Sequence, residues 1–210
     1  GNIATISTGN SGNINVTGNI QGSHSLNLQA GENLNAQNID LSNTNGRAAT
    51  LALTATSGSI NTGNLNTKGS TSGGDITIKA KTAITTGAIT TSGQKAGNVF
   101  IDPDNDVQVG YINAQSTNGV GGNIDITTAR FFRATETFVD QNGVTASLSS
   151  AGSQGGGTIT IRNGGNGTTP FTVGNASENG TQGAITSGEH TISPTPVSYT
   201  HLRAHETEAD

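Results

Sequence analysis

The stretch "DITIKA", Asp75–Ala80, carries the pattern on which the fold depends: two aliphatic residues with a single residue between them. Such alternation has the period of a β-strand, and it places both aliphatic side chains on one face. The same pattern occurs in five other parts of the chain. It recurs in "SLNLQA", "TLALTA", "NVFIDP", "NIDITT" and "TITIRN", whose first aliphatic residues are Leu26, Leu51, Val99, Ile124 and Ile159.

The aliphatic pairs are spaced almost evenly along the chain. With Ile76 included, the steps between their first members are 25, 25, 23, 25 and 35 residues. Two further aliphatic residues follow each of the first four pairs: Leu34 and Ile39, Ile60 and Leu65, Ile84 and Ile89, and Val107 and Ile112. A unit of about 25 residues with three short strands predicts an all-β fold, the parallel β-helix, in which each coil stacks on the one before.

The composition also favours short strands joined by tight turns. Gly accounts for 31 of the 210 residues, and Gly, Thr, Ser and Asn dominate the chain, which disfavours helix. Only 30% of residues are hydrophobic, but disordered chains are normally rich in charge and here only 11% are charged. A lone coil buries too little to fold, so we expect stability from stacking and an open sheet edge at each end.

Charge and cysteine content exclude several classes of function. The formal net charge of −5 is mild and the chain has no run of Lys or Arg, so we expect neither nucleic acid nor an anionic membrane surface as a partner. No apolar stretch approaches the ~20 residues that span a bilayer, which argues against direct membrane insertion. The chain has no cysteine, so it has no disulfide framework and no thiolate chemistry.

The 35-residue step before Ile159 predicts an insert of about ten residues. This part of the chain, near residues 129–143, reads "ARFFRATETFVDQNG" and holds three of the five phenylalanines. They are Phe131, Phe132 and Phe138. We favour the interpretation that these rings cover the side of the β-helix or fill its core, and the alternative is a recognition patch for a sugar or a partner protein.

The stretch "IDPDNDVQV", residues 101–109, has the D-x-D-x-D spacing of calcium loops. The three aspartates are Asp102, Asp104 and Asp106. An EF-hand also needs Gly at loop position six and Glu at position twelve, where this chain has Val107 and Asn113. "DPDN", with Pro in second place, predicts a type I turn, which we favour over a weak cation site.

The remaining candidate residues carry little functional signal. Asn-x-Ser/Thr triplets at Asn15, Asn175 and Asn179 are expected in a chain so rich in these residues. The single histidines His24 and His190 are expected to be exposed to solvent. The sequence therefore predicts no catalytic, cofactor-binding or metal-binding residue.

Two long stretches resemble filamentous-haemagglutinin-like exoproteins, especially large cyanobacterial ones. They are "GNVFIDPDNDVQVGYINAQSTNGVGGNIDITTARFFRATETFVDQNGVTASLSS", residues 97–150, and "GGGTITIRNGGNGTTPFTVGNASENGTQGAITSG", residues 155–188. The resemblance covers most of residues 1–193. It implies a right-handed β-helix that an outer-membrane two-partner transporter exports, so that the protein is secreted or stays on the bacterial surface. It further implies an adhesin or stalk whose partners are cell-surface glycans or proteins.

Two other functions fit a β-helix. A carbohydrate-active lyase or hydrolase needs clustered carboxylates and basic residues on one face, but the positions equivalent to Asp102 on other coils are Thr54, Lys79 and Thr127. An ice-binding β-helix needs a regular threonine array. The outward column between the paired aliphatic residues instead reads Asn27, Ala52, Thr77, Phe100, Asp125 and Thr160.

The final stretch, "VSYTHLRAHETEAD", differs from the rest because it has no Gly and no Asn. Its His201 and His205, four residues apart, have the spacing that helices use to bind zinc. However, residues 197–207 resemble the translation, in one reading frame, of a transposase-derived sequencing adapter. We therefore expect residues 194–210 to be a disordered tail foreign to the natural protein. The chain also begins at Gly1 without Met, so we expect residues 1–193 to be a segment of a longer rod.

Overall fold

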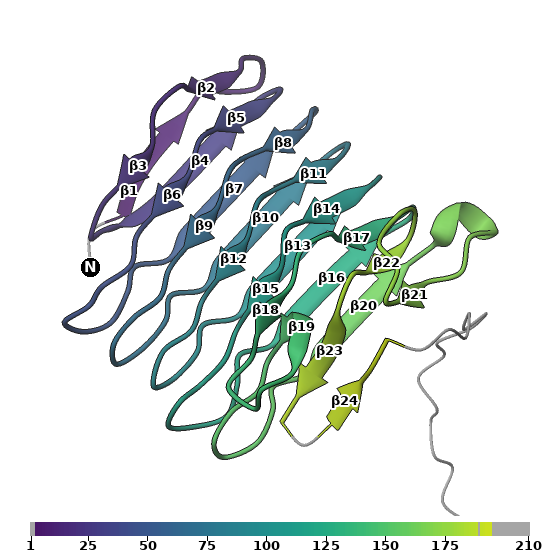
Figure 1. The fold of residues 1–210 in the computed structure, drawn as a ribbon. Helices are drawn as coiled ribbons and strands as arrows, with labels where there is room; N and C mark the ends of the chain where they lie inside the picture. The colour runs from purple at the N-terminus through teal and green to yellow at the C-terminus, as the bar shows by residue number, and fades with distance from the viewer. Residues whose placement is uncertain (1–2, 189, 195–210) are drawn as a thin grey trace, which may run out of the picture.

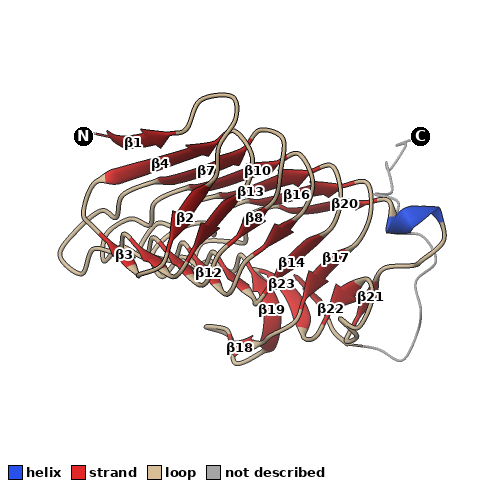
Figure 2. Cartoon of the chain, turned by 90° about the horizontal axis from the view of Figure 1, so that it is seen from above, coloured by secondary structure: helices blue, strands red, loops and turns tan. Residues whose placement is uncertain are grey.

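The computed structural model describes residues 3–188 and 190–194, and this part of the chain is a parallel β-helix (Figure 1). Each regular coil contributes one strand to each of three sheets, and equivalent strands of successive coils pair in parallel. The coils stack side by side from the N-terminal end to the irregular last coils (Figure 2). The predicted all-β fold, with three short strands per coil, is confirmed.

The first sheet contains the alternating aliphatic pairs. In sheet order its strands are β1 (Ile3–Ser7), β4 (Ser25–Ala30), β7 (Leu51–Ala55), β10 (Ile76–Ala80), β13 (Val99–Pro103), β16 (Ile124–Thr128) and β20 (Ile159–Asn163). The strands of the repeat are short because a turn follows each of them, in most cases one that contains Gly or Asn, and the corners of the coil lie at these turns.

The second and third sheets are built on the two further aliphatic positions. The second sheet consists of β2 (Ile14–Val16), β5 (Leu34–Ala36), β8 (Ile60–Asn61), β11 (Ile84–Thr85), β14 (Val107–Val109), β17 (Phe132–Ala134), β22 (Gly180–Thr181) and β21 (Thr172–Val173). The third consists of β3 (Ile20–Gln21), β6 (Ile39–Asp40), β9 (Leu65–Asn66), β12 (Ile89–Thr90), β15 (Ile112–Asn113), β19 (Thr145–Ser149), β23 (Ala184–Ser187) and β24 (His190–Ile192), with β18 (Phe138–Val139) paired to β19. The described residues include a short 3-10 helix, η1 (Gly165–Gly167), and no helix long and apolar enough to cross a bilayer.

The pairing register agrees with the alignment of the sequence repeats. In the first sheet, Ile76 pairs with Leu51 on one side and with Val99 on the other. The columns of the other two sheets are also in register, for example Ile84 with Val107 and Ile89 with Ile112. These side chains point inward and form one continuous core along the stack. Interior columns of aliphatic side chains, in contact from coil to coil, supply the hydrophobic stabilisation that a single coil lacks.

One coil of the stack was not predicted. Strand β1 pairs with β4 so that Ala4 lies beside Leu26 and Ile6 beside Leu28. The alternating pattern is therefore present, but Ala4 stands in the place of an aliphatic residue. A search for aliphatic pairs does not detect such a strand.

Successive coils approach closely at the glycine corners before β10, β13, β16 and β20. Here the backbone N–H of Gly97 donates to the carbonyl of Thr91 at 2.8 Å, and the Thr91 hydroxyl donates to the carbonyl of Gly97 at 2.8 Å. A Cβ atom on Gly97 would overlap the carbonyl oxygen of Gly74 on the preceding coil. Gly122 meets the carbonyl of Gly97 in the same way. The corner therefore requires glycine because a neighbouring backbone occupies the space of a side chain.

The insert lies later in the chain than predicted. Residues 129–134 belong to a regular coil, since Phe132 on β17 pairs in register with Val107. The extra residues come after β17, where β18 and β19 form an antiparallel hairpin. The insert predicted near residues 129–143 therefore began too early in the chain. The prediction was wrong there because Phe132 occupies a core position that an aliphatic residue fills in other coils.

A buried carboxylate fastens this hairpin to the stack. Oδ1 of Asp140 accepts hydrogen bonds from the backbone N–H groups of Asn142 and Val144, both at 2.9 Å. Its Oδ2 accepts from the Thr186 hydroxyl at 2.8 Å. Asp140 is only 4% exposed, so these donors replace the water that a carboxylate requires. The contact joins the hairpin to β23 of the last coil.

The two ends of the stack differ. At the N-terminal end the first strand is open, with Ile3 65% and Ile6 52% exposed. At the other end, β24 runs antiparallel along β23 and covers the edge of the third sheet. The ring of Phe171 also stacks on Phe132, with ring centroids 6.0 Å apart, and closes the core. The expectation of an open coil at both ends therefore holds for the N-terminal end, but is wrong for the third sheet at the C-terminal end.

The corner glycines generate the first prediction. Replacing Gly97 by Ala forces a Cβ atom against a carbonyl oxygen of the adjoining coil, so it should lower the free energy of unfolding by about 1–3 kcal/mol. Gly18→Ala is the matched control, because a Cβ at Gly18 has no heavy atom within 4 Å. Urea titrations followed by circular dichroism measure both variants. Equal stabilities of the two variants would contradict the close approach.

The buried carboxylate generates the second prediction. Asp140→Ala removes a charged acceptor and leaves two backbone N–H groups unpaired, so the free energy of unfolding should fall by about 2–3 kcal/mol. Asp102→Ala is the control, since Asp102 is an exposed aspartate and its loss should change stability little. The same urea titrations compare them, and an Asp140→Ala midpoint equal to that of Asp102→Ala would show that Asp140 is no anchor.

Candidate functional site

Two of the three aspartates with calcium-loop spacing contact cationic side chains of neighbouring coils. The Asp104 carboxylate forms an ion pair with Lys81 of the preceding coil. That of Asp106 lies 3.4 Å from Nε of Arg130 on the following coil, and also accepts the backbone N–H of Phe131 at 3.2 Å. The hydrogen bond to Asp104 and the negative charge of that carboxylate raise the pKa of Lys81. Two of the three carboxylates thus already have a positively charged partner.

The turn at this place is shifted relative to the prediction. Strand β13 continues through Pro103, and the chain bends at Asp104 and Asn105, so a type I turn with Pro103 in second place was wrong. Asp102 consequently lies within the strand, beside Lys79 of the preceding coil. Within residues 3–188 and 190–194, no three His, Cys, Asp or Glu side chains are grouped in a way that could hold a metal ion.

The three phenylalanines near the insert lie in three different environments. Phe132 is fully buried in the core and stacks on Phe171. Phe131 is half-buried outside it, with the guanidinium carbon of Arg130 5.7 Å from the centroid of its ring. Phe138, on the hairpin, packs against Tyr111 with ring centroids 4.7 Å apart. Phe132 thus has the predicted packing role, and the three rings do not form a single patch.

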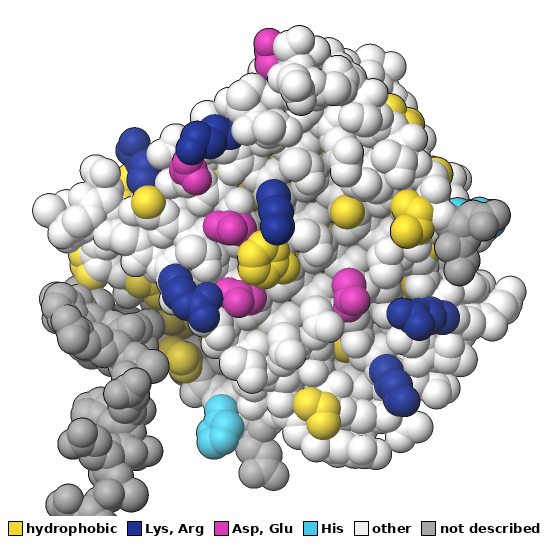
Figure 3. All heavy atoms as spheres, turned by 180° about the vertical axis from the view of Figure 1, so that it is seen from behind, with side chains coloured by type: hydrophobic (Ala, Val, Ile, Leu, Met, Phe, Trp, Pro, Cys, Tyr) yellow, Lys and Arg dark blue, Asp and Glu magenta, His cyan; other side chains and the backbone are white. Residues whose placement is uncertain are grey.

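The outer face of the first sheet carries interspersed charges of both signs (Figure 3). Nη1 of Arg162 lies 2.8 Å from Oδ1 of Asp125, and Nζ of Lys79 lies 5.4 Å from the centroid of the Phe100 ring. These charged side chains therefore interact with other side chains of the same face. Exposed pairs of this kind contribute little to stability, about 0–1 kcal/mol each.

The outward columns of the first sheet follow the register expected from the sequence. Asp102 aligns with Lys79, and Lys79 aligns with Thr54. The column between the aliphatic pairs is also aligned as expected, in the order Asn27, Ala52, Thr77, Phe100, Asp125 and Thr160. This face thus bears a mixed set of side chains that changes from coil to coil.

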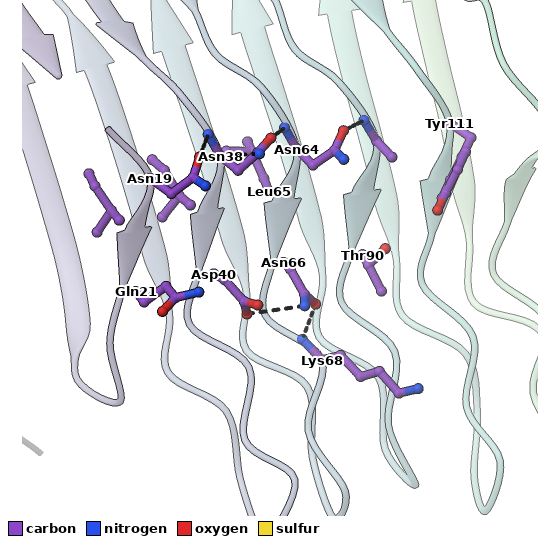
Figure 4. A pocket seen from close by; sticks show the side chains of 13 residues that line it. Asn19, Gln21, Asn38, Asp40, Asn64, Leu65, Asn66, Lys68, Thr90 and Tyr111 are labelled. Atoms are coloured by element: carbon purple, nitrogen blue, oxygen red, sulfur yellow. Dashed lines mark hydrogen bonds between the residues drawn. The ribbon is translucent and has the colours of Figure 1, made fainter. Parts of the chain in front are cut away.

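The third sheet presents a different surface, a shallow groove with a volume of about 400 Å³ (Figure 4). Two rows of side chains line the groove, one on each side of the inward-facing aliphatic column. The first row contains Asn19, Asn38, Asn64, Ala88 and Tyr111. The second row contains Gln21, Asp40, Asn66 and Thr90. The two rows follow the stacking direction across five consecutive strands of the third sheet: β3, β6, β9, β12 and β15. Each coil adds one residue to each row, but the coil of β15 contributes only Tyr111.

Hydrogen bonds between coils hold several polar side chains of both rows in place. In the first row, Oδ1 of Asn38 accepts the backbone N–H of Asn64 at 2.8 Å, and Oδ1 of Asn64 accepts the backbone N–H of Ala88 at 2.9 Å. In the second row, Nδ2 of Asn66 donates to Oδ1 of Asp40 at 3.1 Å. Figure 4 shows these bonds running from coil to coil. The groove is therefore lined by polar groups in fixed positions.

The other candidate residues lie apart from this groove's rows. The Asn179 side chain is 3% exposed and its Nδ2 donates to Asn163 and to the carbonyl of Thr169, both at 3.0 Å, which makes it a structural residue. Asn15 and Asn175 are exposed. The exposure predicted for His24 and His190 is confirmed. His201 and His205 lie outside the described residues. Sequence reasoning missed the groove because its polar residues are those expected on the outside of any coil.

Comparisons with known proteins do not add to this description. No family model, no curated protein and no solved structure matches the chain. Function is therefore inferred from the sequence and from the coils and surfaces of the molecule itself.

The aspartates generate the third prediction. Because Asp104 and Asp106 already contact Lys81 and Arg130, calcium at about 1 mM should leave the melting temperature unchanged. Thermal melts with calcium and with a chelator measure this. A calcium-dependent rise in the melting temperature that disappears in Asp104→Asn would contradict the prediction and establish a cation site.

Proposed function

We propose that this chain is a structural and adhesive stalk segment of a large secreted or cell-surface bacterial exoprotein, without catalytic activity. The resemblance of residues 97–150 and 155–188 to filamentous-haemagglutinin-like exoproteins supports export through an outer-membrane two-partner transporter. Cell-surface glycans or proteins are the partners that such a role implies.

The observation that carries the proposal is the unbroken pairing of strands from coil to coil. In the first sheet each strand from β1 to β20 is hydrogen-bonded to its neighbours, so the molecule is built as a rod from equivalent strand pairings repeated along one axis. A solenoid of this kind displays a long surface whose side chains vary freely, which suits a spacer or an extended binding surface. Charged pairs within single faces, such as Arg162 with Asp125, suit a solvent-exposed rod.

The alternatives have less support from the described residues. A lyase or hydrolase would use acid and base groups that face a common substrate. Here Asp104 and Asp106 instead pair with cations of the adjoining coils. Ice binding would need a flat threonine array, whereas the aligned outward column places Phe100 and Asp125 between Thr77 and Thr160.

The fourth prediction tests the absence of catalysis. The purified protein, incubated with pectin, polygalacturonate and other plant polysaccharides, should release neither unsaturated products nor new reducing ends. A pectate lyase in parallel reactions is the positive control. Turnover proportional to protein concentration would overturn the stalk proposal in favour of a carbohydrate-active enzyme. Thermal hysteresis in the same sample would overturn it in favour of ice binding.

A further inference from the structure

We propose that the groove on the third sheet binds a neutral, unbranched oligosaccharide that lies along the stacking direction, with Tyr111 as its aromatic wall. The inference rests on the proposed adhesive function and names the ligand class of that function. The groove crosses five coils in four steps of about 4.8 Å, so it is about 19 Å long. This length suits an oligosaccharide.

The first row of the groove changes from amides to apolar groups toward its Tyr111 end. Asn19, Asn38 and Asn64 form a continuous series of amides, but the next coil has Ala88 and the coil after it has Tyr111. Ala88 is only 7% exposed, so its methyl group lies at the floor of the groove, and Tyr111 supplies the exposed apolar surface at this end. In Figure 4 the Tyr111 side chain lies across the end of the groove.

The insert hairpin holds the Tyr111 ring in place. The Phe138 ring lies 4.7 Å from it, at an interplanar angle of 40°, and both residues are half-buried. An aromatic ring fixed in this way loses little conformational entropy when a ligand packs against it. A pyranose ring has an apolar face of C–H bonds, and tyrosine offers an apolar ring with a polar hydroxyl at its tip. The geometry therefore suits a sugar better than a wholly polar or wholly apolar ligand.

The second row supplies both hydrogen-bond donors and acceptors. Oδ1 of Asp40 accepts the backbone N–H of Ser42 at 3.0 Å and the Asn66 amide at 3.1 Å, which fixes the carboxylate. Among the described residues, Oδ2 of Asp40 and the Thr90 hydroxyl accept and donate no hydrogen bond to protein groups. Sugar hydroxyls both donate and accept, so they match such a mixed row.

The charges of the groove favour a neutral ligand. Asp40 and Lys68 are the charged residues among those that line it, one of each sign. The balance gives no net field that would select an acidic polysaccharide. A few fixed polar groups beside an apolar wall are typical of sites that orient a small ligand.

The fifth prediction tests the groove with three neutral hexasaccharides: cellohexaose, chitohexaose and mannohexaose. We expect isothermal titration calorimetry to show binding of at least one of them with a Kd below about 1 mM. Tyr111→Ala and Asn66→Ala should each weaken that binding at least about tenfold, one by removing the wall and the other by removing the amide that holds the Asp40 carboxylate in place. Phe100→Ala is the matched control, since it removes an aromatic ring from the first sheet and should leave the Kd unchanged. Circular dichroism verifies that each variant is folded.

Three results would overturn the groove proposal. They are the absence of binding by all three sugars, binding that Phe100→Ala abolishes while both groove variants retain it, and binding of oligogalacturonate or of an unstructured peptide in place of the neutral sugars. None of these results bears on the stalk proposal. Breakdown of the hexasaccharides in the same samples, measured by product analysis, would instead overturn the stalk proposal.

Discussion

Close contact between the backbones of successive coils is the constraint on which the whole structure depends. At the glycine corners before β10, β13, β16 and β20, a carbonyl of one coil occupies the space that a side chain of the next would need, as between Gly74 and Gly97. This approach accompanies the pairing of strands in all three sheets. Since a single coil cannot compensate the entropy of ordering its own backbone, the glycines are as necessary as the buried aliphatic residues.

The same constraint leaves the outer surface free to vary. Inward positions must be apolar and corners must be small, but residues such as Asp40 and Thr90 point outward and are in contact mainly with the equivalent residue of the next coil. Because equivalent residues of successive coils lie side by side, a different residue on one coil changes one position of a continuous row. The change from Asn64 to Ala88 thus replaces an amide by a methyl group while β9 and β12 remain paired in register.

The sequence predicted the core but not the surface, for a physical reason. Aliphatic residues at fixed spacing reveal buried columns, and Ile76, Ile84 and Ile89 lie where that spacing put them. The same criterion missed β1, because Ala4 stands where other coils have a larger aliphatic residue. It also misplaced the insert, because Phe132 fills a core position that is aliphatic in other coils. The groove could not be predicted, because outward polar residues have no required identity. The contact between Tyr111 and Phe138 depends on how the hairpin folds back, which no local pattern encodes.

The strand reversal at the end of the third sheet has a consequence for how copies of this molecule meet. Head-to-tail polymerisation of a parallel solenoid needs an acceptor edge in each of its sheets, since a partner strand must pair in parallel with all three. Strand β24 runs antiparallel on β23 and occupies one of these edges. While β24 occupies this edge, a further coil cannot pair in parallel with β23, so a strand added to the third sheet here must first displace β24.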